Sequence, residues 1–196
     1  MITIIKYAKR WGTITMFIPD NFVVPTEVEF SIAEGLLRLQ PLGRFLARID
    51  YDVVVTNRDH LKGVFGELDN WWPSDDLSFY DNYDMLIWHE EQFIARESFA
   101  YAICLNKSYI GCTYIYGLKE VCDIVTDKDP KKIYVFMWTD KAMFRKGVDA
   151  KAFLKIKQWI ENVWCFAKAD YPGRITPLSS FGPKTAAWII TLGDKL

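Results

Sequence analysis

A short basic segment that contains a glycine is the part of this chain whose residue types most directly suggest chemistry. It holds Lys141, Arg145, Lys146 and Gly147, and it lies between a run of β-forming residues and a helical pattern. Free backbone N–H groups at a helix N-terminus attract anions, and nearby cations add to the attraction. The segment therefore predicts an anion-binding turn. A plain strand-to-helix connection with solvated cations gives the same pattern and is the commoner case.

A carboxylate among apolar residues is the second candidate for chemistry. The segment Asn82–Glu97 has the period of a helix, and Glu90 falls inside its apolar arc. A desolvated carboxylate has a raised pKa, which suits a general base. The alternative is a glutamate at the rim of the arc that pairs with Arg96 or another cation. The two histidines, His60 and His89, lack partners for a catalytic triad and are expected to be packed or surface residues.

Length and composition describe a globular chain of one domain. The 196 residues are 51% hydrophobic and 25% charged, with a formal net charge of −1. This balance gives no electrostatic case for nucleic acid, and no apolar run approaches the ~20 residues of a membrane span. The cysteines have neither a CxxC pair nor zinc-ligand spacing, so we expect reduced thiols and no metal. Cations interrupt the first apolar segment, which argues against a signal peptide and for a cytoplasmic protein.

The elements that would position these residues mix strands and helices. Apolar spacing predicts a helix at Val148–Trp164 and a strand before it at Ile133–Trp138. Two β-rich segments around Asn106 and Lys107 predict an antiparallel hairpin. The other predicted elements are strands at Leu36–Leu42, Val121–Val125 and Thr185–Leu192, helices at Phe45–Thr56 and Asn57–Phe65 (the second capped by Asn57), and a turn at Tyr171–Arg174. This order favours an α+β or mixed α/β fold, with helices covering a largely antiparallel central sheet.

The element order and three segments resemble the GCN5-related N-acetyltransferase (GNAT) superfamily. The matching segments are Thr56–Gly66, Trp88–Tyr101 and Tyr109–Tyr116. The resemblance runs from Pro25 to Arg174, so we expect an N-terminal extension at residues 1–24 and a GNAT-like N-acyltransferase domain at residues 25–196. It implies that Ile133–Trp138 is the acetyl-CoA-binding strand and that Tyr109–Tyr116 is the strand before it.

The resemblance also implies transfer of an acetyl group from acetyl-CoA to an amine. In the superfamily the pantetheine arm pairs with an exposed strand edge, and the pyrophosphate sits on the turn that follows. A carboxylate deprotonates the acceptor, and a tyrosine often protonates the departing thiolate. Carried onto this chain, the pantetheine edge is Phe136, Met137 and Trp138, the phosphate turn is Arg145, Lys146, Gly147 and Val148, and the acid–base residues are Glu90, Asp123 and Tyr171.

The turn departs from the superfamily pattern, which leaves more than one function open. Aligned on Gly147, the turn has Phe144 at the first motif position and Asp149 where a small residue is usual; aligned on Arg145 and Ala150, it has Gly147 one place early. The Asp149 carboxylate would repel a pyrophosphate, although it favours the helix dipole. Asp149 could instead cap the helix of a protein that binds no cofactor, and Asp123 and Tyr171 also fit ordinary turns. The expected function is an N-acetyltransferase for an unknown amine acceptor. The alternatives are a catalytically degenerate acyl-CoA-binding or sensor protein, and a homodimeric structural protein with an aromatic interface.

Overall fold

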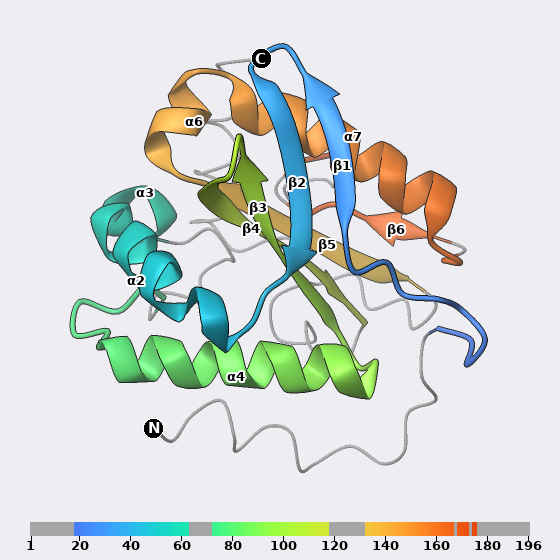
Figure 1. Ribbon diagram of the computed structural model, residues 1–196, viewed down its shortest axis with the longest axis horizontal. Coiled ribbons are helices and arrows are strands. Elements are labelled where there is room, and N and C mark those ends of the chain that lie inside the picture. The colour runs from blue at the N-terminus through green and yellow to red at the C-terminus, as the bar shows by residue number, and fades with distance from the viewer. Residues whose placement is uncertain (1–17, 63–71, 118–131, 167, 173, 176–196) are drawn as a thin grey trace.

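Six strands lie side by side in chain order across one sheet (Figure 1). The computed structural model describes residues 18–62, 72–117, 132–166, 168–172 and 174–175. The strands are β1 (Val28–Ile32), β2 (Gly35–Pro41), β3 (Phe99–Leu105), β4 (Ser108–Tyr116), β5 (Ile133–Thr139) and β6 (Ala169–Asp170). Neighbouring strands are antiparallel except β5 and β6, which are parallel. The predicted α+β fold with a mostly antiparallel central sheet is confirmed.

The central strands are buried on both faces, and this explains why their sequences are almost continuously apolar. β3 and β4 form the predicted hairpin through Asn106 and Lys107, which both have the positive φ that a two-residue turn requires. The Asn106 side chain also ties this turn to the β1–β2 turn. Its Oδ1 accepts from the N–H of Leu36, and its Nδ2 donates to the carbonyl of Glu34, both at 2.9 Å. The sequence pattern had not predicted β1.

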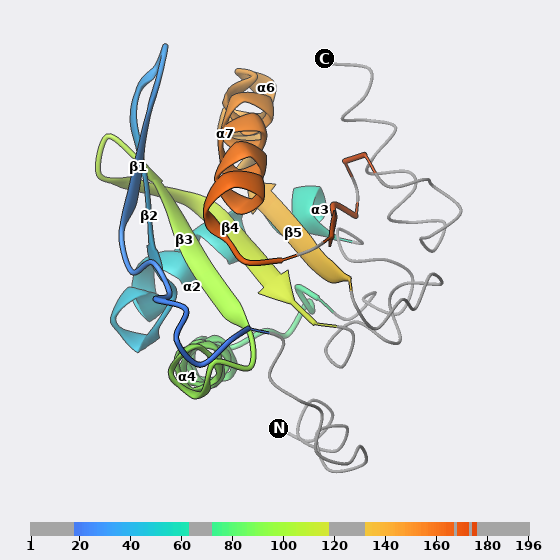
Figure 2. The same ribbon diagram turned by 90° about the vertical axis from the view of Figure 1, so that its right-hand side faces the viewer.

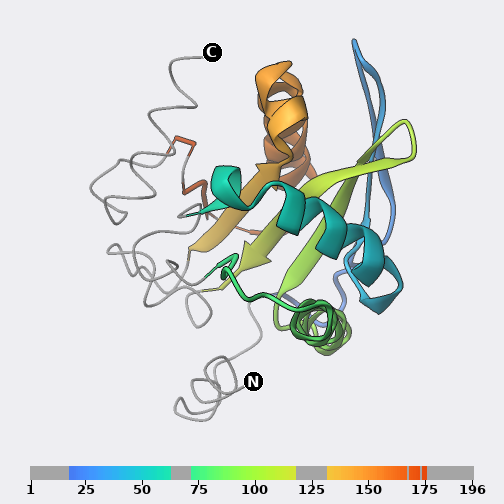
Figure 3. The same ribbon diagram turned by 90° about the vertical axis from the view of Figure 1, so that its left-hand side faces the viewer.

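Helices cover both faces of the sheet (Figure 2, Figure 3). Helix α7 (Val148–Val163) packs on one face, while α2 (Ala47–Thr56) and α4 (Phe79–Ala95) pack on the other, with the short helix η1 (Arg44–Leu46) before α2. The side chains of β5 alternate between the two cores: Met137 packs on the α7 side and Trp138 on the side of α2 and α4. Over the described residues, no helix is both long and apolar enough to cross a membrane.

The structure corrects two predicted connections. The expected polar turn at Lys141 is a helix of five residues, α6 (Lys141–Arg145), because Asp140 Oδ1 accepts from the Met143 N–H at 2.8 Å and caps it. Asn57 does not cap α3 (Arg58–Leu61) with its side chain. It donates instead to the Val53 carbonyl at 2.8 Å and accepts from the Lys141 N–H at 2.9 Å. The predicted strands at Val121–Val125 and Thr185–Leu192 lie outside the described residues.

Residues 18–24 belong to the predicted N-terminal extension, and they pack against the rest of the described chain. Ile18 is 2% exposed and belongs to the core on the α7 side. The ring of Phe22 lies 5.3 Å from that of Trp164. Arg96 Nη2 donates to the carbonyls of Pro19 and Phe22, at 2.8 and 3.0 Å. The segment from residue 18 to residue 24 is therefore part of the packed domain, while residues 1–17 lie outside the described part of the chain.

We expect Gly111→Ala to destabilise the fold because β4 and β5 approach closely there. A Cβ at position 111 would lie 2.1 Å from the Trp138 carbonyl oxygen and 2.8 Å from Thr139 Cα, and both are backbone atoms. The expected loss is about 1–3 kcal/mol of unfolding free energy, measured by urea denaturation. The control is Gly147→Ala, where a Cβ would meet nothing within 4 Å. Its positive φ should cost only about 1 kcal/mol. Equal losses in the two variants would contradict the close approach.

Candidate donor site at the edge of strand β5

The pairing of β5 with β6 ends after two residues, and this leaves part of β5 without a strand neighbour on that side in the described chain. The two paired residues of β5 are Ile133 and Tyr134. The Ile133 N–H donates to the Lys168 carbonyl at 3.1 Å, so the Ile133 backbone faces β6. Because backbone direction alternates along a strand, Met137 and Thr139 face the same side. An exposed strand edge of this kind can receive an extended ligand as an added strand.

Two of the three residues predicted for the pantetheine edge present their backbones to the opposite side. The Phe136 carbonyl accepts from Thr113 Oγ1 of β4 at 2.9 Å. The Trp138 carbonyl lies against Gly111 of β4. Only Met137 of the three therefore offers its backbone to the open edge, and the prediction for the other two is corrected, because hydrogen-bonding direction alternates with the same period as the side chains. A contact between acetyl-CoA and the side chains of Phe136 or Trp138 stays a prediction.

The predicted phosphate turn leads into α7 beside this edge. Arg145 and Lys146 are exposed, and Gly147 adopts a left-handed conformation with φ 74°. A Cβ at position 147 would meet nothing within 4 Å, so the left-handed backbone and not crowding explains the glycine. No side chain caps α7, and the first N–H groups of a helix, here from Val148 on, have no acceptor within the helix. The turn thus combines two cations with the N-terminal N–H groups of a helix that no side chain of the described residues caps, an arrangement that suits an anion.

Asp149 neither caps α7 nor faces an incoming phosphate. Its side chain is 2% exposed and forms a two-pronged ion pair with Arg174, which is 5% exposed. Arg174 Nη2 lies 2.9 Å from Asp149 Oδ1, and Thr139 Oγ1 donates to the same oxygen at 3.0 Å. Arg174 Nη2 also lies 3.4 Å from the Met137 carbonyl oxygen. The expected repulsion of a pyrophosphate by Asp149 is therefore wrong, because Arg174 neutralises the carboxylate.

Glu90 is not a desolvated carboxylate. Its Oε2 accepts from the backbone N–H and the Nε of Arg44, at 3.1 and 2.9 Å, and its side chain is 32% exposed. These hydrogen bonds from Arg44 hold the pKa of Glu90 below its usual range, against the predicted rise. The pair lies where β2 leads into η1, and β3 and β4 separate β2 from the open edge of β5. The alternative of a cation-paired glutamate is confirmed, although the partner is Arg44 and not Arg96.

Of the other two predicted acid–base residues, the structure describes Tyr171 but not Asp123. Asp123 lies outside the described residues. Tyr171 follows β6 and is 2% exposed, with its ring 5.7 Å from that of Phe153 in α7. Burial raises the pKa of its hydroxyl. The predicted turn is present, since the Arg174 N–H donates to the Tyr171 carbonyl at 3.0 Å. The role of Tyr171 as an acid stays a prediction.

His89 is buried and His60 is half-buried, and burial lowers the pKa of each. His89 lies between the rings of Trp88 and Tyr114, and its pKa falls to about 3. With so low a pKa, the His89 imidazole is almost entirely neutral near pH 7 and is a poor general base. His60 Nε2 lies 3.2 Å from the Thr139 carbonyl oxygen, and its pKa is also lowered. In the described part of the chain, no group of three or more potential metal ligands occurs.

A buried polar network between α2, α4 and β4 had no counterpart in the sequence predictions. Asp50 is 3% exposed and accepts from Asn82 Nδ2 at 2.7 Å and from the Tyr109 hydroxyl. The Tyr109 hydroxyl lies 2.9 Å from Cys112 Sγ. Burial raises the pKa of Asp50 and outweighs the two hydrogen bonds, which act in the opposite direction. The sequence feature that could have predicted this network is the helical spacing of Asp50 and Val54, which places both on the buried face of α2.

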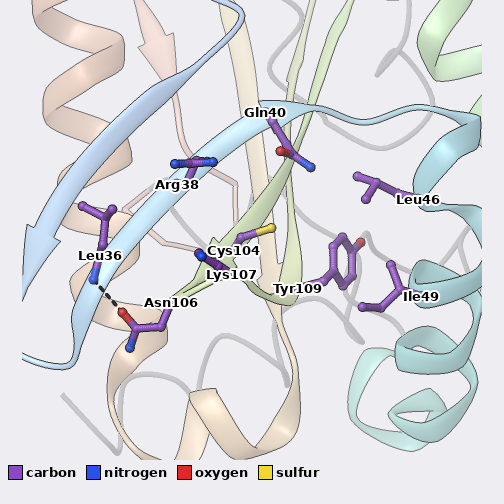
Figure 4. A pocket seen from close by; sticks show the side chains of 9 residues that line it. All are labelled: Leu36, Arg38, Gln40, Leu46, Ile49, Cys104, Asn106, Lys107 and Tyr109. Carbon is purple, nitrogen blue, oxygen red and sulfur yellow. Dashed lines mark hydrogen bonds between the residues drawn. The ribbon is translucent and has the colours of Figure 1, made fainter.

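A hollow of about 440 Å³ lies away from the open edge, between α2 and the β2–β3 part of the sheet (Figure 4). Leu46 of η1 and Ile49 of α2 form one side, and Arg38, Lys107 and Tyr109 contribute to the other. Strand β4 separates this hollow from β5. The two cations in its wall oppose a protonated amine. The hollow is therefore neither the open edge nor an obvious site for a cationic acceptor.

Two solved N-acetyltransferases share the fold. RimL, a ribosomal L7/L12 alpha-N-protein acetyltransferase in complex with coenzyme A, aligns with a TM-score of 0.52 and 12% identity, over 68% of this chain and 67% of that chain. A ribosomal-protein-S5-alanine acetyltransferase from Vibrio fischeri aligns with a TM-score of 0.51 and 17% identity, over 85% and 82%. No profile of a known family and no curated protein matches the sequence. The chain therefore shares the acyl-CoA N-acyltransferase fold of these two proteins.

We expect Glu90→Gln to lower the melting temperature slightly, because Glu90 acts in an ion pair with Arg44. Glutamine keeps an acceptor for the Arg44 N–H but loses the attraction to the guanidinium, which is small for an exposed pair. Because the pKa of Glu90 is lowered on folding, its contribution is present above the unfolded pKa and is lost as pH falls through the folded pKa. The difference between wild type and variant should therefore shrink below about pH 4.

Thermal melts at pH 3 and pH 7 test this, with Glu91→Gln on the same helix as the control for net charge. A turnover loss of about 10²-fold per folded molecule would instead restore Glu90 as a base.

The unfolding free energy of the Asp50→Asn variant should rise relative to that of wild type as pH rises. The pKa of Asp50 is raised on folding, so its contribution to stability is full below the unfolded pKa and is lost as pH rises through the folded pKa. Asparagine does not titrate, so the unfolding free energy of wild type minus that of the variant should fall as pH rises above about 4. Urea denaturation measures it. Val54→Ala on the same buried face should give a penalty that does not change with pH, and a difference that grows with pH would refute the raised pKa.

Proposed function

We propose that this protein is an N-acetyltransferase that transfers an acetyl group from acetyl-CoA to the amine of a small molecule or a protein. The proposal is carried by one observation: among the described residues, β5 has no parallel neighbour after Tyr134 and turns the Met137 backbone to that side, next to the start of α7. The shared fold adds support, since the RimL structure is a complex with coenzyme A. The acceptor is not identified by this argument.

The donor would be held by two features of the chain. The amides of an extended pantetheine arm match the backbone groups that an unpaired strand edge offers, and Met137 is the predicted residue that presents them. The pyrophosphate would lie on the first N–H groups of α7, with Arg145 and Lys146 as its cationic partners. Gly147 supports this placement, because its left-handed backbone ends α6 and turns the chain into α7 beside the edge.

The transfer needs a neutral acceptor amine and a proton for the departing thiolate. The amine nitrogen attacks the thioester carbonyl, the carbon–sulfur bond breaks, and the thiolate takes up a proton. Asp123 and Tyr171 remain the proposed base and acid. Glu90 is no longer favoured as the base, because its pKa is lowered and it forms an ion pair with Arg44. An amine that binds already neutral would need no base.

A catalytically degenerate acyl-CoA-binding or sensor protein is the second candidate. The observation that favours it is the ion pair of Asp149 and Arg174, which lies where the donor arm would pass. The two candidates differ in one measurement, since the degenerate protein binds acetyl-CoA without releasing free thiol in the presence of amines. Homodimerisation is a separate proposal, which light scattering of the purified chain tests.

We expect Arg145→Ala to weaken acetyl-CoA binding by about 1–2 kcal/mol, roughly ten-fold in Kd, because one charge-assisted contact to the pyrophosphate is lost. Isothermal titration calorimetry with acetyl-CoA measures the change. Lys155→Ala is the matched control, since Lys155 is a cation of α7 well beyond its first turn. Unchanged affinity in Arg145→Ala, with wild type binding, would remove this turn from the donor site.

A further inference from the structure

The geometry points to a latch on the donor site, formed by Arg174 and closed by its ion pair with Asp149. In the closed arrangement, the guanidinium of Arg174 takes the Met137 carbonyl that the pantetheine arm would use. This inference rests on the proposed function, because it concerns the same donor edge. It adds that acetyl-CoA binds only when Arg174 leaves the edge.

The latch is defined by contacts that converge from three parts of the chain. Arg174 follows β6, Asp149 lies in the first turn of α7, and Met137 and Thr139 belong to β5. Arg174 Nη2 lies 2.9 Å from Asp149 Oδ1 and 3.4 Å from the Met137 carbonyl oxygen. Its Cζ lies 5.2 Å from the centre of the Phe153 ring. One guanidinium thus spans the space between β5 and the chain that leaves β6.

The burial of both charges explains why the latch is closed without a donor. The side chains of Arg174 and Asp149 are 5% and 2% exposed. A buried charge that loses its partner is strongly unfavourable, so neither residue leaves alone without a large penalty. Thr139 Oγ1, at 3.0 Å from Asp149 Oδ1, holds the carboxylate in place. The closed state is therefore the predominant one, and the open state that binds the donor is a minority.

The latch also gives a reason for the residue that departs from the superfamily pattern. Asp149 replaces a small residue at the second helical position of α7, and its side chain turns inward to Arg174 and not outward to the turn. A small residue at position 149 would remove this two-pronged ion pair. Asp149 and Arg174 therefore act as a pair, and a double variant that removes both side chains tests the pair directly.

The test compares acetyl-CoA affinity of wild type with that of the double variant Asp149→Ala plus Arg174→Ala. A donor that binds a minor state has its apparent affinity reduced by the fraction of that state. With an open state at or below about 10%, opening the edge should tighten binding about ten-fold or more by calorimetry. The double variant avoids a buried unpaired charge, and circular dichroism checks its fold. Lys132→Ala plus Asp170→Ala is the matched control, because that 3.2 Å pair lies at the paired end of β5 and β6.

Tighter binding in the latch variant alone supports the latch. If wild type binds acetyl-CoA and the latch variant binds it with the same or lower affinity, the latch is overturned and the proposed function stands. A complete loss of binding in the latch variant would identify Arg174 as a pyrophosphate ligand. No binding to wild type or to either folded variant overturns both, because an open edge would then still not accept acetyl-CoA. If the double variant fails to fold, Arg174→Lys decides: lysine keeps the charge without the two-pronged geometry, so tighter binding supports the latch and unchanged binding overturns it.

Discussion

The end of the parallel pairing between β5 and β6 is the constraint on which the site depends. A buried strand must find partners for its backbone N–H and carbonyl groups, and β5 is buried along its whole length. On one side β4 supplies them through antiparallel pairing. On the other side β6 supplies them only at the start, and side chains contact the edge farther along: Arg174 at the Met137 carbonyl and His60 at that of Thr139. The open edge is thus both a place where a ligand can pair and a place that the protein's own side chains occupy.

The charges at this edge follow from the same constraint. An arginine brought to a buried carbonyl needs a buried counter-charge, and Asp149 provides it from the first turn of α7. Thr139 then completes the hydrogen bonding of the carboxylate. The ion pair joins β5, α7 and the chain after β6, so the sequence departure at position 149 is part of the packing. The exposed cations Arg145 and Lys146 remain outside this pair and face solvent.

The two faces of the sheet differ in chemistry. The α7 face is apolar and aromatic, with Tyr101, Trp159 and Trp164 in edge-to-face contact. The other face contains the polar network around Asp50 within an otherwise apolar core. Burial favours the neutral forms of Asp50 and His89, so Asp50 contributes hydrogen bonds and His89 contributes ring packing, and neither contributes charge. The acid–base chemistry of the proposed transfer consequently falls to other residues.

The sequence alone determined the features that depend on local spacing. The hairpin of β3 and β4, strand β5 before Gly147 and the amphipathic α7 after it all follow from short-range patterns, as does the fold class. Only the tertiary structure decided which groups meet: Glu90 with Arg44 across 46 positions, Asp149 with Arg174 across 25, and Asp50 with Tyr109 across 59. It also decided which strand edge is open, since the direction of a backbone group is fixed by its neighbours in the sheet. The physical reason is that a residue's type sets what it can bind, whereas its pKa and its partner depend on burial and on chain segments that its local sequence does not specify.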